Sequence, residues 1–241
     1  HVFLANGDRR IDAVRVLLAS GKCDLSHVDH FGKNALTSSF NPEIRGMVFE
    51  YMASKCSSDV ELSALNAELK RFELEIEYLD AARRGDYDRL LSALDLGVNV
   101  NATDGENQSA MCLESSGNEA IFNLLISRGF DVNSSGTLIK HSLFGNEKMI
   151  KLLLKYPGID VNIKDSRGRT ALILACYMGN VEAVRVLLED GRIDIFVRDA
   201  DGCTAFDFGP KLINSDTVSE INSLLLYQLN SFYLFNGFEL K

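Results

Sequence analysis

Along much of the chain the hydrophobic residues recur at helical spacing, and the helices that they predict recur with a period of 34 residues. The hexapeptide AVRVLL at Ala13–Leu18 occurs again at Ala183–Leu188, which is 170 residues, or five such periods, further on. In each copy three apolar side chains stand at i, i+3 and i+4, so they lie on one face of a helix. We therefore expect both copies to be helices that pack against neighbouring helices.

Each copy belongs to a longer repeated segment. A segment starts with Gly and a polar residue and continues with an apolar helical stripe, and most segments end with Gly and an Asp/Asn-Val-Asn turn. After the first copy, the segments begin at Gly85, Gly117, Gly145 and Gly179.

The stretches between these segments also share a pattern. Three of them begin with Asp-x-x-Gly, at Asp29, Asp165 and Asp199. This pattern is typical of a β-turn, because Gly readily adopts a positive φ. Thr170 and Thr204 follow at the position from which a hydroxyl can cap a helix. The unit is thus predicted to consist of a turn, a short helix and a second helix.

These residues resemble the ankyrin repeat, whose pattern is D-x-x-G-x-T-P-L-H-x-A-A-x-x-G followed by a Leu-Leu helix and D-V-N. The resemblance covers most of the chain and is most specific in Asp160–Phe208. It implies an all-α ankyrin-repeat solenoid, in which helix pairs stack and short β-turn or hairpin fingers project. The array departs from the pattern in two places: Thr170–Ile173 lacks the family's Pro and His, and about five finger residues are missing after Asn133. We expect that finger to be stunted or absent.

A long helix is predicted in the middle of the chain, from about Asp59 to Arg84. Ser58 and Glu61 form a capping box, and a stripe with heptad spacing follows. The stripe either packs against neighbouring repeats or forms an intermolecular coiled coil. Because it is shorter than four heptads, packing is favoured. The stripe consists of Leu62, Leu65, Leu69, Phe72, Ile76 and Leu79.

The same features predict how the chain is organised. A second capping box, Thr217 and Glu220, begins a C-terminal helix, and an aromatic tail follows it. We expect this end to cap the array, with docking on a partner as the alternative. The predicted parts are an N-terminal pair of repeats with the first incomplete, a connecting helix, a second array and a C-terminal cap: 1–58, 59–84, 85–209 and 210–241.

The amino-acid composition limits the compartment in which we expect the protein and the kinds of partner that it can bind. The formal net charge of −9 argues against direct nucleic-acid binding, which needs a surplus of Lys and Arg. No apolar run is long enough for membrane insertion. The cysteines are odd in number and widely spaced, which favours reduced thiols and a cytoplasmic or nuclear protein. They are Cys23, Cys56, Cys112, Cys176 and Cys203.

The sequence offers little catalytic chemistry. No nucleophile, zinc-protease or phosphate-loop motif occurs, so we expect no enzymatic activity, no cofactor and no small-molecule ligand. Cys23–His30 (CDLSHVDH) could supply metal ligands. However, Cys23 aligns with Ile193 and His30 falls at a finger tip, so the repeat register explains these residues without a metal.

By resemblance, partners of ankyrin repeats contact the finger tips and the exposed end of the first helix. Phe31, Arg167 and Tyr177 are the expected anchors, because aromatic and Arg side chains dominate interface energetics. The full set of candidate partner-binding residues is His30, Phe31, Lys33, Glu106, Gln108, Ser166, Arg167, Arg169, Tyr177, Met178 and Asp201.

The resemblance implies a protein-protein interaction module, acting as a scaffold, adaptor or regulatory subunit whose partner is another protein. An alternative is the targeting or substrate-recruiting region of a larger enzyme or effector, since the chain starts inside a repeat at His1. A third reading is a transcriptional regulator, because divergent arrays with insertions are similar to those of fungal cell-cycle transcription cofactors.

Overall fold

The computed structural model describes residues 11–25, 27–28, 34–36, 41–208 and 215–235, and within these residues it contains helices but no β-strand. The fold is therefore the all-α arrangement that the resemblance implied. The chain divides into two compact units, each of which is described by itself. Unit 1 comprises residues 1–80 and 88–107, and unit 2 comprises residues 81–87 and 108–241.

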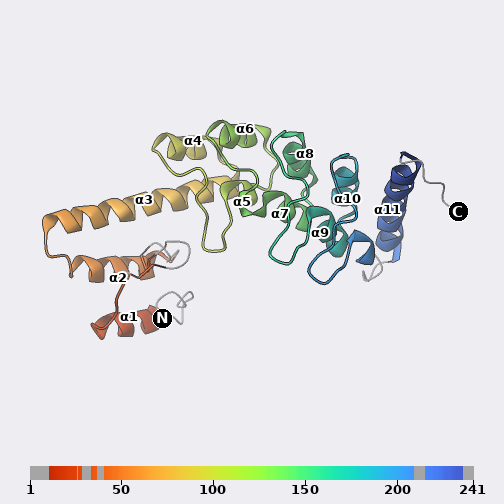
Figure 1. Ribbon diagram of the computed structural model, residues 1–241. Helices are drawn as coiled ribbons and strands as arrows, with labels where there is room; N and C mark the ends of the chain where they lie inside the picture. The colour runs from red at the N-terminus through yellow and green to blue at the C-terminus, as the bar shows by residue number, and fades with distance from the viewer. Residues whose placement is uncertain (1–10, 26, 29–33, 37–40, 209–214, 236–241) are drawn as a thin grey trace. The chain divides into compact units, whose positions relative to one another are not determined.

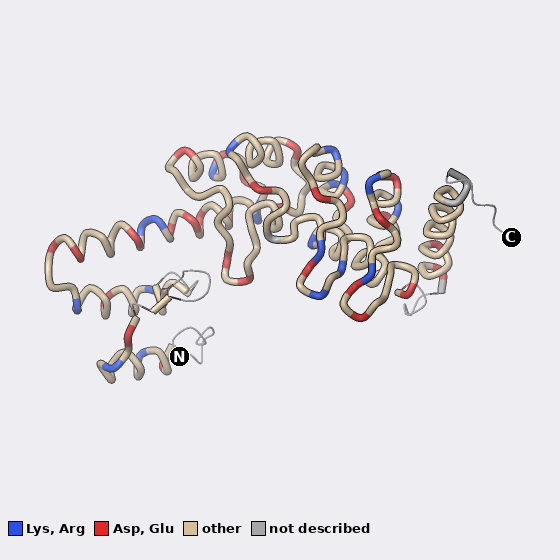
Figure 2. Tube along the Cα trace, viewed as in Figure 1, with Lys and Arg blue, Asp and Glu red and all other residues tan. Residues whose placement is uncertain are grey.

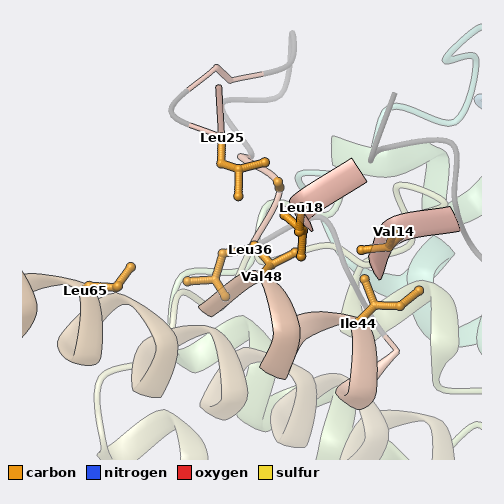
Figure 3. Close-up of a cluster of buried hydrophobic side chains, with 8 residues drawn as sticks. Val14, Leu18, Leu25, Leu36, Ile44, Val48 and Leu65 are labelled. Atoms are coloured by element: carbon orange, nitrogen blue, oxygen red, sulfur yellow. The ribbon is translucent and has the colours of Figure 1, made fainter. Parts of the chain in front are cut away.

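Unit 1 is built from helices that enclose a small apolar core. Its helices are α1 (Ile11–Ala19), α2 (Pro42–Ala53), most of α3 (Asp59–Arg84) and most of α4 (Tyr87–Asp95). Val14 and Leu18 of α1 are buried, as the first AVRVLL copy predicted. They pack with Ile44 and Val48 of α2 and with Leu65 of α3 (Figure 3).

The long helix α3 covers the range that the capping box and the apolar stripe predicted (Figure 1). The Glu61 amide donates to Ser58 Oγ at 3.3 Å, whereas the Glu61 carboxylate accepts from the amide of Ser57. Leu65 and Phe72 of the stripe are buried within unit 1, so at these positions the stripe packs internally. The role of α3 as a connector between two arrays stays a prediction.

Unit 2 is a stack of helix pairs in two rows. α7 contacts α9, and α8 contacts α10, so first helices lie beside first helices and second beside second (Figure 1). We call the first helices and η4 the inner row and the second helices the outer row. The inner row is α5 (Ala110–Leu113), α7 (Thr137–Leu143), α9 (Ala171–Met178) and η4 (Ala205–Asp207); the outer row is α6 (Glu119–Ser127), α8 (Glu147–Lys155) and α10 (Val181–Leu188).

Helix caps in unit 2 follow the sequence pattern. Thr170 Oγ1 accepts from the amide of Ile173 at 3.4 Å, and Thr204 forms a capping box with Asp207. The Thr170 hydroxyl therefore caps α9 as predicted, whereas the Thr204 hydroxyl donates to the Asp207 carboxylate, which also accepts from the Thr204 amide. In the second AVRVLL copy, Val184, Leu187 and Leu188 are buried, which confirms their packing role.

Asparagine side chains tie successive repeats together at two junctions of unit 2. The Nδ2 of Asn133 donates to Gly158 O at 2.9 Å, and its Oδ1 accepts from the Asp160 amide at 2.8 Å. Asn162 makes the same pair of bonds in the next repeat, with Arg192 O and the Asp194 amide, both at 2.8 Å. The side chains thus satisfy main-chain groups of the following turn, which fixes the register of the stack.

Two irregularities interrupt the period. After Asn133 a short 3-10 turn, η3 (Ser134–Gly136), leads directly into α7, so the finger is absent as expected. The inner helix α5 has only four residues and is followed by Glu114, which is 1% exposed. Its carboxylate accepts from the amides of Ser116 at 2.9 Å and Gly117 at 3.0 Å, and so satisfies groups that a longer helix would have bonded.

The C-terminal helix α11 (Ser215–Phe235) covers the last outer helix. Its buried residues Ile221 and Leu225 face α10, and Arg185 of α10 pairs with Glu220 at 2.7 Å. Phe232 also packs against a residue of the preceding turn, Phe196. The tail predicted to cap the array continues beyond Phe235 into residues 236–241, which lie outside the described residues.

Candidate partner-binding surface

The finger at residues 165–169 is a tight turn organised by Asp165. Asp165 Oδ1 accepts from the amides of Arg167 and Arg169, each at 2.9 Å, and the Asp165 amide donates to Arg169 O at 3.0 Å. Gly168 adopts a φ of +74°, which the turn requires. The predicted β-turn is present, and its tip exposes Ser166 and Arg167.

Arg169 is engaged within its own finger. Its Nε donates to Asp165 Oδ2 at 2.8 Å, and its Nη2 lies 2.7 Å from the same oxygen. Partial burial opposes ionisation of Asp165, but the hydrogen bonds from the Arg169 side chain and from the Arg169 and Arg167 amides outweigh it and lower the pKa of Asp165. Arg169 therefore stiffens the finger, and its guanidinium has fewer donors left for a partner.

The next finger, residues 199–203, is bonded to the first. Asp199 Oδ1 accepts from the amides of Asp201 at 3.0 Å and Cys203 at 2.8 Å. Between the fingers, the Ala200 amide donates to Arg167 O at 2.8 Å. A Cβ on Gly168 would lie only 3.1 Å from the Ala200 nitrogen, so the two fingers touch (Figure 2). Asp201 is exposed at the tip of the second finger.

An earlier finger at residues 104–108 uses a different residue at its turn. Asn107 stands where the pattern has Gly, and it adopts a φ of 57°, a conformation that Asn tolerates better than most side chains. Glu106 is exposed and its amide donates to Asp104 Oδ1 at 2.9 Å. Glu106 belongs to unit 1 and Gln108, which is half-buried, to unit 2.

Large apolar side chains are exposed at the ends of the inner helices. Tyr177 and Met178 at the end of α9 are 51% and 47% exposed, and Phe144, which follows α7, is 70% exposed. The Tyr177 ring packs edge to face on Phe208, with centroids 5.6 Å apart. We call these four residues the aromatic patch.

The sequence prediction placed Tyr177 and Met178 at this position but missed Phe144 and Phe208. A signal for Phe144 was present, because it immediately precedes Gly145 as Met178 precedes Gly179. His30, Phe31 and Lys33, the candidates nearest the N-terminus, lie outside the described residues. The role of every candidate in partner binding stays a prediction.

A buried histidine replaces a small residue beneath this surface. His141 of α7 is 3% exposed, and its Nε2 lies 2.8 Å from Met111 O of α5. Burial lowers the pKa of His141, against the opposing effects of the Met111 bond and of the nearby carboxylate of Glu114. A neutral imidazole that donates to Met111 O accounts for this geometry, so the side chain has a structural role.

The described residues offer no converging metal ligands, since no group of three His, Cys, Asp or Glu side chains is placed to hold an ion. In the candidate metal segment, the Cys23 thiol donates to Leu17 O at 3.2 Å. Burial raises the pKa of Cys176 to about 12, which keeps this thiol protonated. In the part of the chain that the structure describes, no helix combines the length and the apolarity needed to cross a membrane.

Comparison with known proteins agrees with this geometry. A family model described as ankyrin repeats (3 copies) matches residues 79–165 and 138–209. Together these matches span residues 79–209, which is 131 of the 241 residues and more than half of the chain. No curated protein matches the chain significantly. The stacked helix pairs, the Asp-led fingers and the family match together show that the chain belongs to the ankyrin-repeat family.

Proposed function

We propose that this protein is a non-enzymatic binding module that holds a partner protein on the inner row and fingers of unit 2. Ankyrin repeats generally act in protein-protein interaction. The observation that carries the proposal is the aromatic patch, in which Phe144, Tyr177 and Met178 are between 47% and 70% exposed. A cluster of large exposed apolar side chains on a folded protein marks an interaction site.

The packing of α9 against its neighbours supports this role, because it holds the exposed side chains in place without a partner. Residues 171–176 of α9 are all buried, and Gly179 ends the helix with a φ of 73°. Asn180 Nδ2 then donates to Leu143 O at 2.8 Å, which ties the end of α9 to the end of α7. Preorganised side chains lose little entropy on binding, so their contacts contribute more to affinity.

The test begins with a partner purified from the source cells, whose affinity is then measured by calorimetry. The double variant Phe144→Ser/Tyr177→Ser is expected to weaken binding at least about tenfold, since buried aromatic anchors dominate interfaces. Tyr227→Ser is the matched control, because Tyr227 is 72% exposed on α11, away from the inner row.

Tyr177 also packs on Phe208, so the double variant could lose stability as well as affinity. Met178→Glu serves as a second variant, because it places a charge in the patch without removing that ring contact. Melting temperatures are recorded for every variant. Full affinity in folded Phe144→Ser/Tyr177→Ser and Met178→Glu proteins would contradict the proposed surface.

A further inference from the structure

We propose that the partner segment bound by this surface is acidic, with carboxylates beside a large apolar anchor. This inference rests on the proposed function and specifies the partner's chemistry. Its basis is an imbalance on the inner row and fingers of unit 2, where most carboxylates accept hydrogen bonds from their own repeats whereas several cations make no ion pair within the described residues.

Apart from Asp201, the carboxylates of these fingers and of η4 accept hydrogen bonds from their own repeats. Asp165 is paired with Arg169, and Asp199 Oδ1 accepts two amides of its own finger. Asp207 Oδ2 accepts from the amide and the hydroxyl of Thr204, at 2.7 and 2.8 Å. These side chains have a structural function, and their charges are partly offset by the groups that hold them.

The cations of the same surface, in contrast, are not neutralised by carboxylates of the described residues. Lys140 on α7 and Lys164 and Arg167 on the first finger make no ion pair with any carboxylate among the described residues. Arg198, at the base of the next finger, donates from Nη1 to Gly202 O at 2.6 Å, which leaves its charge unbalanced. On the inner row and fingers of unit 2, the side chains of Asp201 and Asp207 are exposed carboxylates.

Several cations of the outer row, by contrast, form ion pairs with nearby carboxylates. Lys151 pairs with Glu147 on α8, and Arg185 lies 2.7 Å from Glu220. Arg192, in the turn after α10, lies 2.6 Å from Asp190. Ion pairs thus hold three cations on the outer row and in its turn, whereas the four cations of the inner row and fingers other than Arg169 make no ion pair in the described part of the chain and remain open to a partner.

The charges close to the binding surface determine which segment binds there, although the whole chain carries a formal net charge of −9. At physiological salt, charges further apart than about 8 Å are largely screened, so a short acidic segment mainly experiences the nearest cations. A nucleic acid would extend many phosphates over the acidic remainder of the surface, which opposes its binding. The same row of helices and fingers carries both these cations and the aromatic patch, which fits a peptide segment with both acidic and apolar side chains.

The experiment selects binders for the full chain from a displayed library of random 16-residue peptides. We expect the selected peptides to be enriched in Asp and Glu next to Leu, Met or an aromatic residue. Enrichment of basic peptides, an absence of charge bias, or an absence of any selected peptide would overturn the inference.

The selected peptides are then measured by fluorescence anisotropy with two double variants of equal net charge. Lys164→Glu/Arg167→Glu should weaken binding about tenfold or more at low salt, and by less at high salt. Lys22→Glu/Lys155→Glu, at exposed positions in unit 1 and on the outer-row helix α8, should bind like the unchanged protein. Equal affinity of both double variants, or tight binding of a single-stranded oligonucleotide at this surface, would overturn the inference.

These outcomes are separable from those of the proposed function. If Phe144→Ser/Tyr177→Ser loses the cellular partner while Lys164→Glu/Arg167→Glu keeps it, the binding surface stands and the acidic character of the partner is wrong. If neither double variant affects the cellular partner, both proposals fail.

Discussion

The ring of Phe196 packs edge to face against the ring of Phe232 on α11, with centroids 5.2 Å apart. Phe196 stands 34 residues after Asn162, at the turn position from which the Asn side chain bonds the following repeat. After this turn the stack continues with the short η4 on the inner row and with α11 on the outer row. An apolar contact therefore replaces the asparagine bonds where the repeats end.

This contact predicts that Phe232 contributes to stability. Phe232→Ala should lower the free energy of unfolding by about 1–2 kcal/mol, because the edge-to-face pair and its buried area are lost while nearly half of the ring is already exposed. Urea unfolding measures the change. Tyr227→Ala on the same helix is the control and should change stability little, since Tyr227 is 72% exposed. An equal loss in both variants would argue against the contact.

A second prediction concerns the junction of the two fingers. Gly168→Ala should destabilise unit 2 by about 1 kcal/mol or more, because Gly168 has a φ of +74° and a Cβ would lie 3.1 Å from the Ala200 nitrogen. Gly191→Ala is the matched control, since Gly191 has no positive φ and a Cβ there would meet nothing within 4 Å. Thermal unfolding compares the two, and similar melting temperatures would show that the fingers are not closely packed.

The buried imidazole of His141 predicts a pH dependence. Its pKa is lowered in the folded state, mainly by burial, so at mildly acidic pH the unfolded chain takes up a proton that the folded chain does not. Stability is therefore complete above the ordinary histidine pKa of about 6.5 and falls as the pH drops through it towards the lowered value. Glu114 and Lys140 are the charged groups that act on the imidazole.

The measurement is urea unfolding between pH 7.5 and 5.5, a range in which most carboxylates stay ionised. His141→Gln can keep a donor for Met111 O, and it should reduce the loss of stability across this range. If the variant and the unchanged protein lose stability equally, the dependence arises from other groups.

Much of unit 2 could be predicted from the sequence because the period fixes its packing positions. Val184 and Leu187 are buried, and Thr170 caps a helix, in agreement with the pattern. These features depend on residues close in the chain, for which helical spacing and turn chemistry are sufficient.

Other features depend on contacts that spacing does not show. Arg169 looked like a partner contact, but its guanidinium folds back onto Asp165 across the turn. His141 and Glu114 occupy buried positions where the repeat pattern has small residues, so their burial could be found only from the packing of α5 against α7. Phe208 joins the aromatic patch through Tyr177, a contact between residues 31 positions apart in the chain.

The most direct test of the central claim is site-specific photo-crosslinking to the partner from the source cells. A photoreactive phenylalanine analogue is placed at Phe144 in one protein and at Tyr227 in another, since the two side chains are 70% and 72% exposed. The account predicts that the partner crosslinks to position 144 and not to position 227. Crosslinking at position 227 with none at position 144 would contradict it.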